Sequence, residues 1–292
     1  MIKGAFTLIV TPFDKNFKLD EDGFRELIRR QVDSGIHGIA PLGVTGESPA
    51  LTDAEIRRVV EICVDEAGGK CLVAPDTCSC NLEQTISRLK LYSELGCDLA
   101  VVFVPFLVLP KSDGVLEFYK RINEVTDIPV LIHNAPGRVG INVEPALYAQ
   151  LARMPHIVGT KDGNKQLDHL AKVIHVTKEQ DFGVFTGKDT TAYPVMMFGG
   201  SGVFTVAGNV IPEVMRDIVD FSLKGDREAA ARLHYDHYEL FEALRFETNP
   251  MAAKEALGSM GLPGQYLRLP LTRLSESKRT VLKEILRQKG LI

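Results

Sequence analysis

The sequence LAVVFVP, residues 99–105, is a short apolar run rich in β-branched side chains, and a stretch with helical spacing of apolar residues follows it at 114–125. The next run, IPVLIHN at residues 128–134, again precedes a helical stretch, at 144–154. Runs without a polar residue at every second position are typical of parallel strands that helices cover on both faces. This part of the chain therefore predicts two strand–helix units of a parallel α/β sheet.

The same unit recurs along most of the chain. Expected strands lie at residues 5–12, 37–43, 71–76, 99–105, 128–134, 157–162, 182–187 and 202–206. Eight such units predict an α/β fold of the TIM-barrel type, a (β/α)8 barrel spanning residues 1–224. Residues 225–292 show helical patterns only, at 226–246, 250–260 and 275–289, so we expect a helical C-terminal extension packed on the barrel. The rival is a doubly wound sheet, but the glycine-rich turn usual after its first strand is replaced here by Thr11-Pro12-Phe13.

The composition is that of an ordinary globular protein. Hydrophobic residues make up 45% of the 292 residues, charged residues 25%, and the net charge is −4. This charge argues against nucleic acid or an anionic membrane surface as the main partner. The N-terminus shows no signal-peptide pattern, and an odd number of cysteines, five, suits reduced thiols. We therefore expect a cytoplasmic protein.

Lys161 is the strongest candidate for a catalytic residue. Active sites of such barrels lie at the C-terminal ends of the strands, and Lys161 comes near the end of the sixth expected strand. Burial there would remove water from the amine, lower its pKa and free it as a nucleophile toward carbonyl groups. The alternative is a lysine that reaches solvent or pairs with Asp162. Lys188, after the seventh strand, competes for the role, but its neighbour Asp189 favours a salt-bridged or exposed lysine.

Other strand ends offer groups for binding and proton transfer. The turn GVTGES, residues 43–48, could bind a small anion through its backbone amides and the Thr45 hydroxyl, although a purely structural turn explains the pattern equally well. Arg138 lies in a Pro-Gly turn, either to bind a carboxylate or simply exposed. His133 ends the fifth strand, either as an acid/base group or as a core histidine. No set of three or four metal-binding side chains is evident, so we expect no metal.

Several short motifs, taken in order, resemble one known family. They are VTPF at 10–13, GVTGES at 43–48, HNAPGRVG at 133–140, GTKD at 159–162, GGSGV at 199–203 and NP at 249–250. Over nearly its whole length the chain resembles the dihydrodipicolinate synthase / N-acetylneuraminate lyase family, the class I pyruvate-dependent aldolases. The resemblance implies a (β/α)8 barrel with a helical C-terminal extension, usually a homotetramer. We also expect Phe204, directly after GGSGV, to line the substrate site.

The resemblance also implies the chemistry of the site. Lys161 would form a covalent imine with the keto carbon of pyruvate or another 2-oxo acid, without a separate cofactor. Thr45 and the neighbouring backbone of Val44 and Gly46 would hold the carboxylate of this keto acid. Arg138 matches the position that binds the carboxylate of the second substrate in the family's synthases.

Three positions depart from those synthases, which pass protons along one threonine and two tyrosines. The matching residues are Val44, Leu107 and His133, so all three hydroxyls are absent. The main hypothesis is therefore a Schiff-base-forming lyase or aldolase that acts on pyruvate or another 2-oxo acid by aldol cleavage, condensation or dehydration. The alternative is the family's synthase reaction, that of a 4-hydroxy-tetrahydrodipicolinate synthase of lysine biosynthesis. A second alternative is a catalytically silent homologue that binds keto acids.

An imidazole that titrates near pH 7 can replace a phenol in proton transfer, so His133 favours turnover over silence. Retained Lys161 and Arg138 favour it too. We expect a homo-oligomer, either a tetramer or a dimer.

Overall fold

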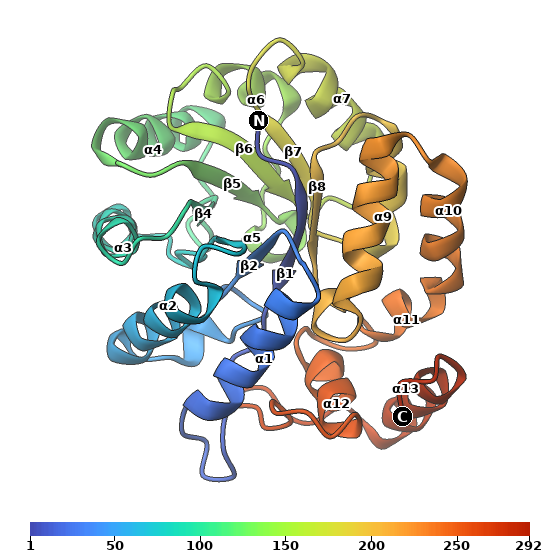
Figure 1. Cartoon of the computed structure of the whole chain (residues 1–292). Coiled ribbons are helices and arrows are strands. Elements are labelled where there is room, and N and C mark those ends of the chain that lie inside the picture. Colours follow the sequence, from blue (N-terminus) through green and yellow to red (C-terminus); the bar gives the residue numbers. More distant parts are fainter.

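Residues 1–292 are described by a computed structural model, in which parallel strands curl round a central axis with helices outside them (Figure 1). The strands are β1 (Gly4–Leu8), β2 (Gly38–Ala40), β3 (Leu72–Val73), β4 (Ala100–Phe103), β5 (Val130–Asn134), β6 (Ile157–Asp162), β7 (Gly183–Thr186) and β8 (Gly202–Thr205). Their order is β3-β2-β1-β8-β7-β6-β5-β4, so sequence neighbours pair and the first strand pairs with the last. This is the strand order of a (β/α)8 barrel, and the expected fold is confirmed.

The barrel closes between β3 and β4 at one residue. Asp76 lies opposite Leu42 on one side and opposite Val101 on the other, in isolated parallel bridges. The Val101 amide donates to the carbonyl of Pro75 at 2.9 Å across the same seam. Pro75 has no N–H to donate, which explains why the regular part of the third strand ends at Val73 and not at Asp76 as expected.

Helices follow the strands as the sequence predicted. They are α1 (Glu21–Asp33), α2 (Asp53–Ala67), α3 (Leu82–Glu94), α4 (Ser112–Val125), α5 (Pro136–Val139), α6 (Pro145–Leu151), α7 (Leu167–Thr177), α8 (Ala192–Met197) and α9 (Pro212–Lys224). Short 3₁₀ turns lie at Ser48–Ala50, Asp189–Thr191 and Ala207–Asn209. The single turn α5 was not predicted; it begins at Pro136, where a missing N–H costs no helical hydrogen bond.

Helix α2 illustrates how local sequence sets these elements. The Thr52 hydroxyl accepts from the Glu55 amide at 3.2 Å, and the Glu55 carboxylate accepts from the Thr52 amide at 2.9 Å. This reciprocal cap begins the helix, and Gly68 ends it with a left-handed φ of 53°. The buried residues recur at helical spacing: Ile56, Val59, Val60, Ile62, Cys63 and Ala67. That face packs on the barrel.

Aromatic rings fill the barrel interior. The Phe6 ring lies 4.8 Å from Phe204 and 5.7 Å from Phe185, measured between ring centroids. Gly38 makes room for this layer, because a Cβ there would lie 2.3 Å from the Phe6 ring. The Lys161 amine lies 5.7 Å from the Phe204 centroid. Since the interior is packed beside Lys161, space for a substrate lies toward the C-terminal ends of the strands.

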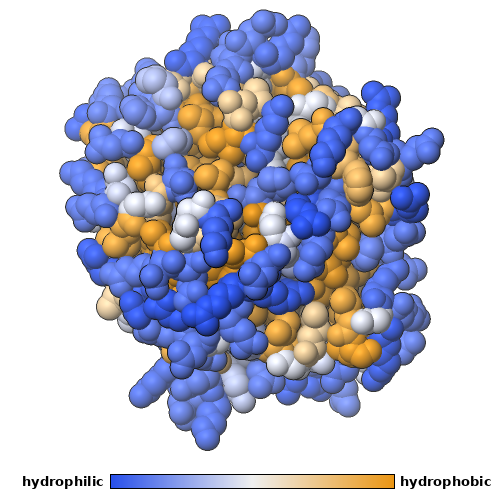
Figure 2. Space-filling view, in the orientation of Figure 1, coloured by the Kyte–Doolittle hydropathy of each residue, from blue (hydrophilic) through white to orange (hydrophobic).

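The remaining helices form the C-terminal region, shown in orange and red in Figure 1. They are α10 (Arg227–Asp236), α11 (Tyr238–Ala243), α12 (Met251–Ser259) and α13 (Glu276–Gln288). The single helix expected at 226–246 is two helices, because His237 has a non-helical φ of −112°. A boundary at residue 224 stays a prediction. Hydrophilic side chains cover most of the face in Figure 2, with hydrophobic ones gathered between them. None of the helices has the length and apolar character needed to cross a membrane.

Candidate active site

Lys161 lies near the end of β6, in register with His133 on β5 and Phe185 on β7. Its side chain is 7% exposed, and burial lowers the pKa of the amine to about 8. The nearest carboxylate oxygen, Asp76 Oδ2, lies 4.0 Å from Nζ and opposes this lowering. About a tenth of the amine is therefore uncharged at pH 7, far more than for an ordinary lysine, and the uncharged form is the nucleophile.

The expected alternative, a structural pair with Asp162, is not formed. Adjacent strand residues point to opposite faces, so Asp162 is directed away from the barrel interior. Its Oδ2 accepts from the Asn134 side-chain amide at 2.9 Å and the Tyr148 hydroxyl at 3.0 Å, and lies 3.2 Å from His169 Nε2. This buried network holds β5 and β6 together behind the site and leaves Lys161 without a salt bridge shorter than that to Asp76.

His133 is bound to a residue that sequence reasoning missed. Its Nδ1 lies 2.8 Å from Asp76 Oδ2, and both side chains are buried. A carboxylate can only accept, so Nδ1 carries the hydrogen and Nε2 keeps its lone pair. Nε2 has no partner within the protein. The only sequence signal for Asp76 is an acidic residue at the end of the third apolar run.

The environment of His133 favours the neutral ring. Burial, followed by the nearby charge of Lys161, lowers the pKa of His133 to about 4, against the opposing effect of Asp76. The Phe103 ring covers the imidazole, with centroids 3.7 Å apart. The pKa is thus below the near-neutral range that the sequence suggested, since the side chain is almost wholly removed from water.

The turn at residues 43–48 adjoins this cluster. A Cβ on Gly43 would lie 3.2 Å from the Asp76 carboxylate. Thr45 is buried, and its hydroxyl accepts from the Asn249 side-chain amide at 2.8 Å, which leaves its own hydrogen free. Val44 is half-buried. The Gly46 amide donates to the Leu42 carbonyl at 2.9 Å within the turn, and its expected part in binding an anion stays a prediction.

A buried ion pair supports the turn from behind. Glu47 has a left-handed φ of 52°, and its Oε1 lies 2.5 Å from Lys254 Nζ on α12. Both side chains are almost fully buried. The Arg268 amide donates to the second Glu47 oxygen at 2.9 Å, and Lys254 donates to the Tyr266 carbonyl at 2.7 Å. Helix α12 and the loop after it therefore fix the conformation of the turn that carries Thr45.

The remaining expected residues lie farther out. Arg138 is exposed on α5, and its guanidinium makes no hydrogen bond or ion pair. Leu107 is 84% exposed and contributes nothing to the interior of this barrel. Lys188 is half-buried, and its expected salt bridge with Asp189 is absent, because Asp189 is buried and accepts from the Thr205 hydroxyl at 2.6 Å. The structure thus brings together Lys161, His133 and Phe204.

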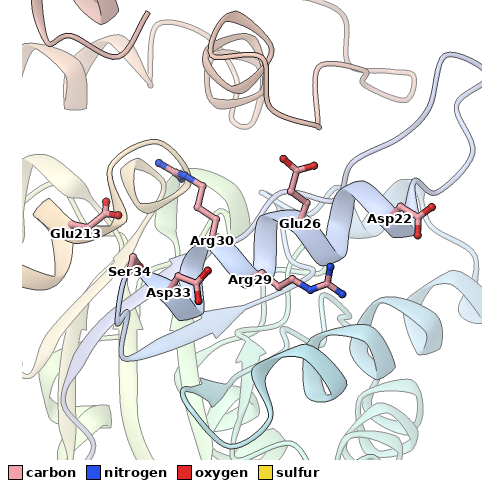
Figure 3. A pocket seen from close by; sticks show the side chains of 7 residues that line it. All are labelled: Asp22, Glu26, Arg29, Arg30, Asp33, Ser34 and Glu213. Carbon is pink, nitrogen blue, oxygen red and sulfur yellow. The ribbon is translucent and has the colours of Figure 1, made fainter.

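An open hollow of about 580 Å³ on the outside of the molecule is unrelated to this cluster (Figure 3). Its lining is charged and polar: Asp22, Glu26, Arg29, Arg30, Asp33, Ser34 and Glu213. Arg30 there donates to the carbonyls of Asn209 and Val210, both at 2.7 Å. The hollow follows α1 and shares no residue with the cluster around Lys161.

Residues 1–289 match the dihydrodipicolinate synthetase family. The chain belongs to this family. The 4-hydroxy-tetrahydrodipicolinate synthase of Methanospirillum hungatei is 38% identical over 98% of this chain and 99% of the relative. The crystal structure of dihydrodipicolinate synthase from Thermotoga maritima has a TM-score of 0.97 at 34% identity, with full coverage of both chains. The chloride-inhibited dihydrodipicolinate synthase from Acinetobacter baumannii, complexed with pyruvate, has a TM-score of 0.97 at 29% identity, also over both full chains.

This member of the dihydrodipicolinate synthetase family is therefore an enzyme of the lyase class, with the fold that the resemblance implied. Membership favours an active lyase over the catalytically silent homologue. The names of the relatives also support the alternative hypothesis, a 4-hydroxy-tetrahydrodipicolinate synthase, better than the broader main hypothesis of an unspecified 2-oxo acid lyase.

Proposed function

We propose that this enzyme forms an imine between Lys161 and the keto carbon of pyruvate, without a separate cofactor, and uses it to make or break a bond at the adjacent carbon. One observation carries the proposal: a buried lysine amine with a pKa of about 8 lies at a strand end, beside an imidazole paired with a carboxylate. The amine attacks the keto carbon, and a carbon–nitrogen bond forms. Its two hydrogens leave with the keto oxygen as water.

His133 is the group that moves these protons. In its neutral form Nδ1–H is bound to Asp76, so Nε2 accepts a proton from the attacking nitrogen and returns it to the departing hydroxyl. The same atom then takes a proton from the carbon next to the imine, and the resulting enamine is the nucleophile of the condensation. In the cleavage direction Nε2 takes the proton of the substrate's hydroxyl.

The carboxylate of the keto acid is held by the 43–48 turn in this proposal. The Thr45 hydroxyl has a free hydrogen, and the backbone amides of Val44 and Thr45 make no hydrogen bond within the protein. Arg138, exposed and unpaired on α5 directly after β5, is available for an anionic group of the second substrate.

The first candidate reaction is that of 4-hydroxy-tetrahydrodipicolinate synthase, the name of the similar proteins. A second candidate is a pyruvate lyase for another aldehyde. Val44 and Leu107 favour it, because neither has a hydroxyl that can pass a proton where the family's synthases have one. In either case His133 is the acid/base group, and the two candidates differ in the aldehyde alone.

The imine is tested by trapping with borohydride in the presence of pyruvate. The reduced pyruvyl mass should appear on a peptide containing Lys161 and vanish in Lys161→Ala. The control Lys90→Ala, an exposed lysine on α3, should keep the adduct. An adduct on Lys188 would refute the assignment.

Turnover with pyruvate and aspartate semialdehyde separates the two reactions. If it comes within about tenfold of an ordinary synthase, the first candidate holds and the hydroxyl relay is dispensable here. Trapping on Lys161 without such turnover identifies the second candidate. A panel of other aldehydes then names the substrate.

We also propose a homo-oligomer, a tetramer or a dimer, in the cytoplasm. The supporting feature is the loop after β4, in which Leu107, Val108 and Leu109 are 84%, 70% and 54% exposed. Three adjacent exposed apolar side chains favour contact with another chain. Sedimentation of the wild type and of Leu107→Ser tests this: a monomeric wild type would refute it.

A further inference from the structure

Asp76 is a buried carboxylate whose two oxygens have separate tasks. Oδ1 accepts from the Cys78 amide at 2.8 Å. Oδ2 faces the site, 2.8 Å from His133 Nδ1 and 4.0 Å from Lys161 Nζ. One oxygen thus contacts both groups to which the proposed reaction assigns chemistry.

The backbone holds this carboxylate in place. Asp76 sits at the seam where the barrel closes, bridged to Leu42 and Val101. Its carbonyl accepts from the Tyr92 hydroxyl at 3.1 Å. Gly43 abuts the carboxylate so closely that a Cβ would meet it at 3.2 Å. The side chain is therefore constrained on its backbone, on Oδ1 and on the face toward the 43–48 turn.

We propose that Asp76 is a positioning residue, which holds His133 in the tautomer with hydrogen on Nδ1 and sets a fixed negative charge beside the Lys161 amine and the cationic imine that replaces it. The inference rests on the proposed imine chemistry of Lys161 and extends it to a residue that none of the sequence motifs contains. Asp76 acts through its two neighbours and takes no part in bond making.

The first effect concerns the proton carrier. Without an acceptor at Nδ1, an imidazole can place its hydrogen on either nitrogen, and the Nε2–H form cannot take a proton from the substrate. With Asp76 in place, a hydrogen on Nδ1 is favoured, and the lone pair of Nε2 is available whenever the ring is neutral. A carboxylate behind the ring also stabilises the imidazolium that forms for the duration of each transfer.

The second effect concerns the charge on nitrogen. The imine is most reactive when protonated, and its nitrogen replaces Nζ, 4.0 Å from Oδ2. Two other titratable groups act on Lys161. The Cys78 thiol is uncharged, because burial raises its pKa to about 12, and the positive charge of Arg245 opposes a cation at this place. For His133 the further groups are Lys161 itself and Asp162 behind the strand. Asp76 is thus the main negative charge available to the cationic imine.

The test is the pH dependence of trapping in Asp76→Asn. Asparagine keeps the oxygen for the Cys78 amide but removes the charge. The rate of trapping by pyruvate and cyanoborohydride should rise with pH to a midpoint near 8 in the wild type. At 4.0 Å and an effective dielectric constant of about 20, loss of the charge should lower this midpoint by ~3 units. The turnover number should fall ~10²-fold. The control is Asp168→Asn, which removes the charge of an exposed carboxylate on α7.

The outcomes separate the two proposals. Absence of a wild-type adduct on Lys161 refutes the proposed function. A wild-type adduct with a midpoint in Asp76→Asn within about 0.5 unit of wild type refutes the role of Asp76 alone. Should the variant not fold, nitrogen NMR of the histidines in the wild type decides, with His133→Asn for assignment. Hydrogen on Nδ1 of His133 at neutral pH supports the role, and hydrogen on Nε2 overturns it.

Discussion

Replacing Lys254 by methionine should cost the protein ~3–5 kcal/mol of stability, because it leaves the Glu47 carboxylate buried without its cation. The two side chains are 0% and 1% exposed, with Nζ and Oε1 2.5 Å apart. Methionine keeps most of the side-chain volume over the Phe13 ring, which the amine approaches to 4.3 Å. The loss is therefore mainly electrostatic. In this variant Glu47 keeps the hydrogen bond that it accepts from the Arg268 amide.

Urea unfolding at neutral pH measures this effect. The double variant Glu47→Gln with Lys254→Met should recover at least ~2 kcal/mol of the loss, because no unpaired charge is left buried. Lys172→Met, which removes the exposed pair with Asp168, should change the free energy of unfolding little. A loss below about 1 kcal/mol in Lys254→Met would show that water or a rearrangement compensates the carboxylate, and would refute the view of this pair as the support of the 43–48 turn.

Three further predictions concern the site itself. His133→Asn should lower turnover at least ~10²-fold and abolish the limb of the pH–rate profile near pH 4; an unchanged profile with lowered thermal stability alone would make the residue structural. The folded pKa of His133, about 4, lies below the ordinary 6.5, so the unfolded chain binds the proton first. As the pH falls from 6.5 to 4, the free energy of unfolding should therefore drop by ~3 kcal/mol in the wild type and less in His133→Asn. Urea titrations at several pH values would detect this difference. Gly46→Ala should destabilise the protein by ~1–3 kcal/mol and raise the half-saturating pyruvate concentration, because its Cβ would lie 2.7 Å from the Leu42 amide nitrogen. Gly137→Ala, with open space around the new Cβ, is the matched control. Equal effects of the two substitutions would contradict the reasoning.

The amino-acid pattern alone predicted the architecture and the position of Lys161 near a strand end. Apolar runs alternating with helical stretches predicted the barrel, because parallel strands covered on both faces must be apolar throughout. The place of Lys161 at a strand end predicted a buried amine, because such strands are covered on both faces, and a buried amine has a lowered pKa. These are local properties, because each can be predicted from a short stretch of sequence. The α5 turn and the break at His237 escaped prediction because single turns and non-helical dihedrals leave little periodic signal.

Which side chains come into contact depends on how the whole chain packs. Asp76 and His133 are 57 residues apart and come within 2.8 Å because strand order and barrel closure set β5 beside the seam of β3 and β4. Glu47 and Lys254 belong to the two ends of the chain and share one buried site. A lone carboxylate in a loop has no periodicity that predicts its partner. Its role follows from register and closure, which arise from packing the whole chain at once.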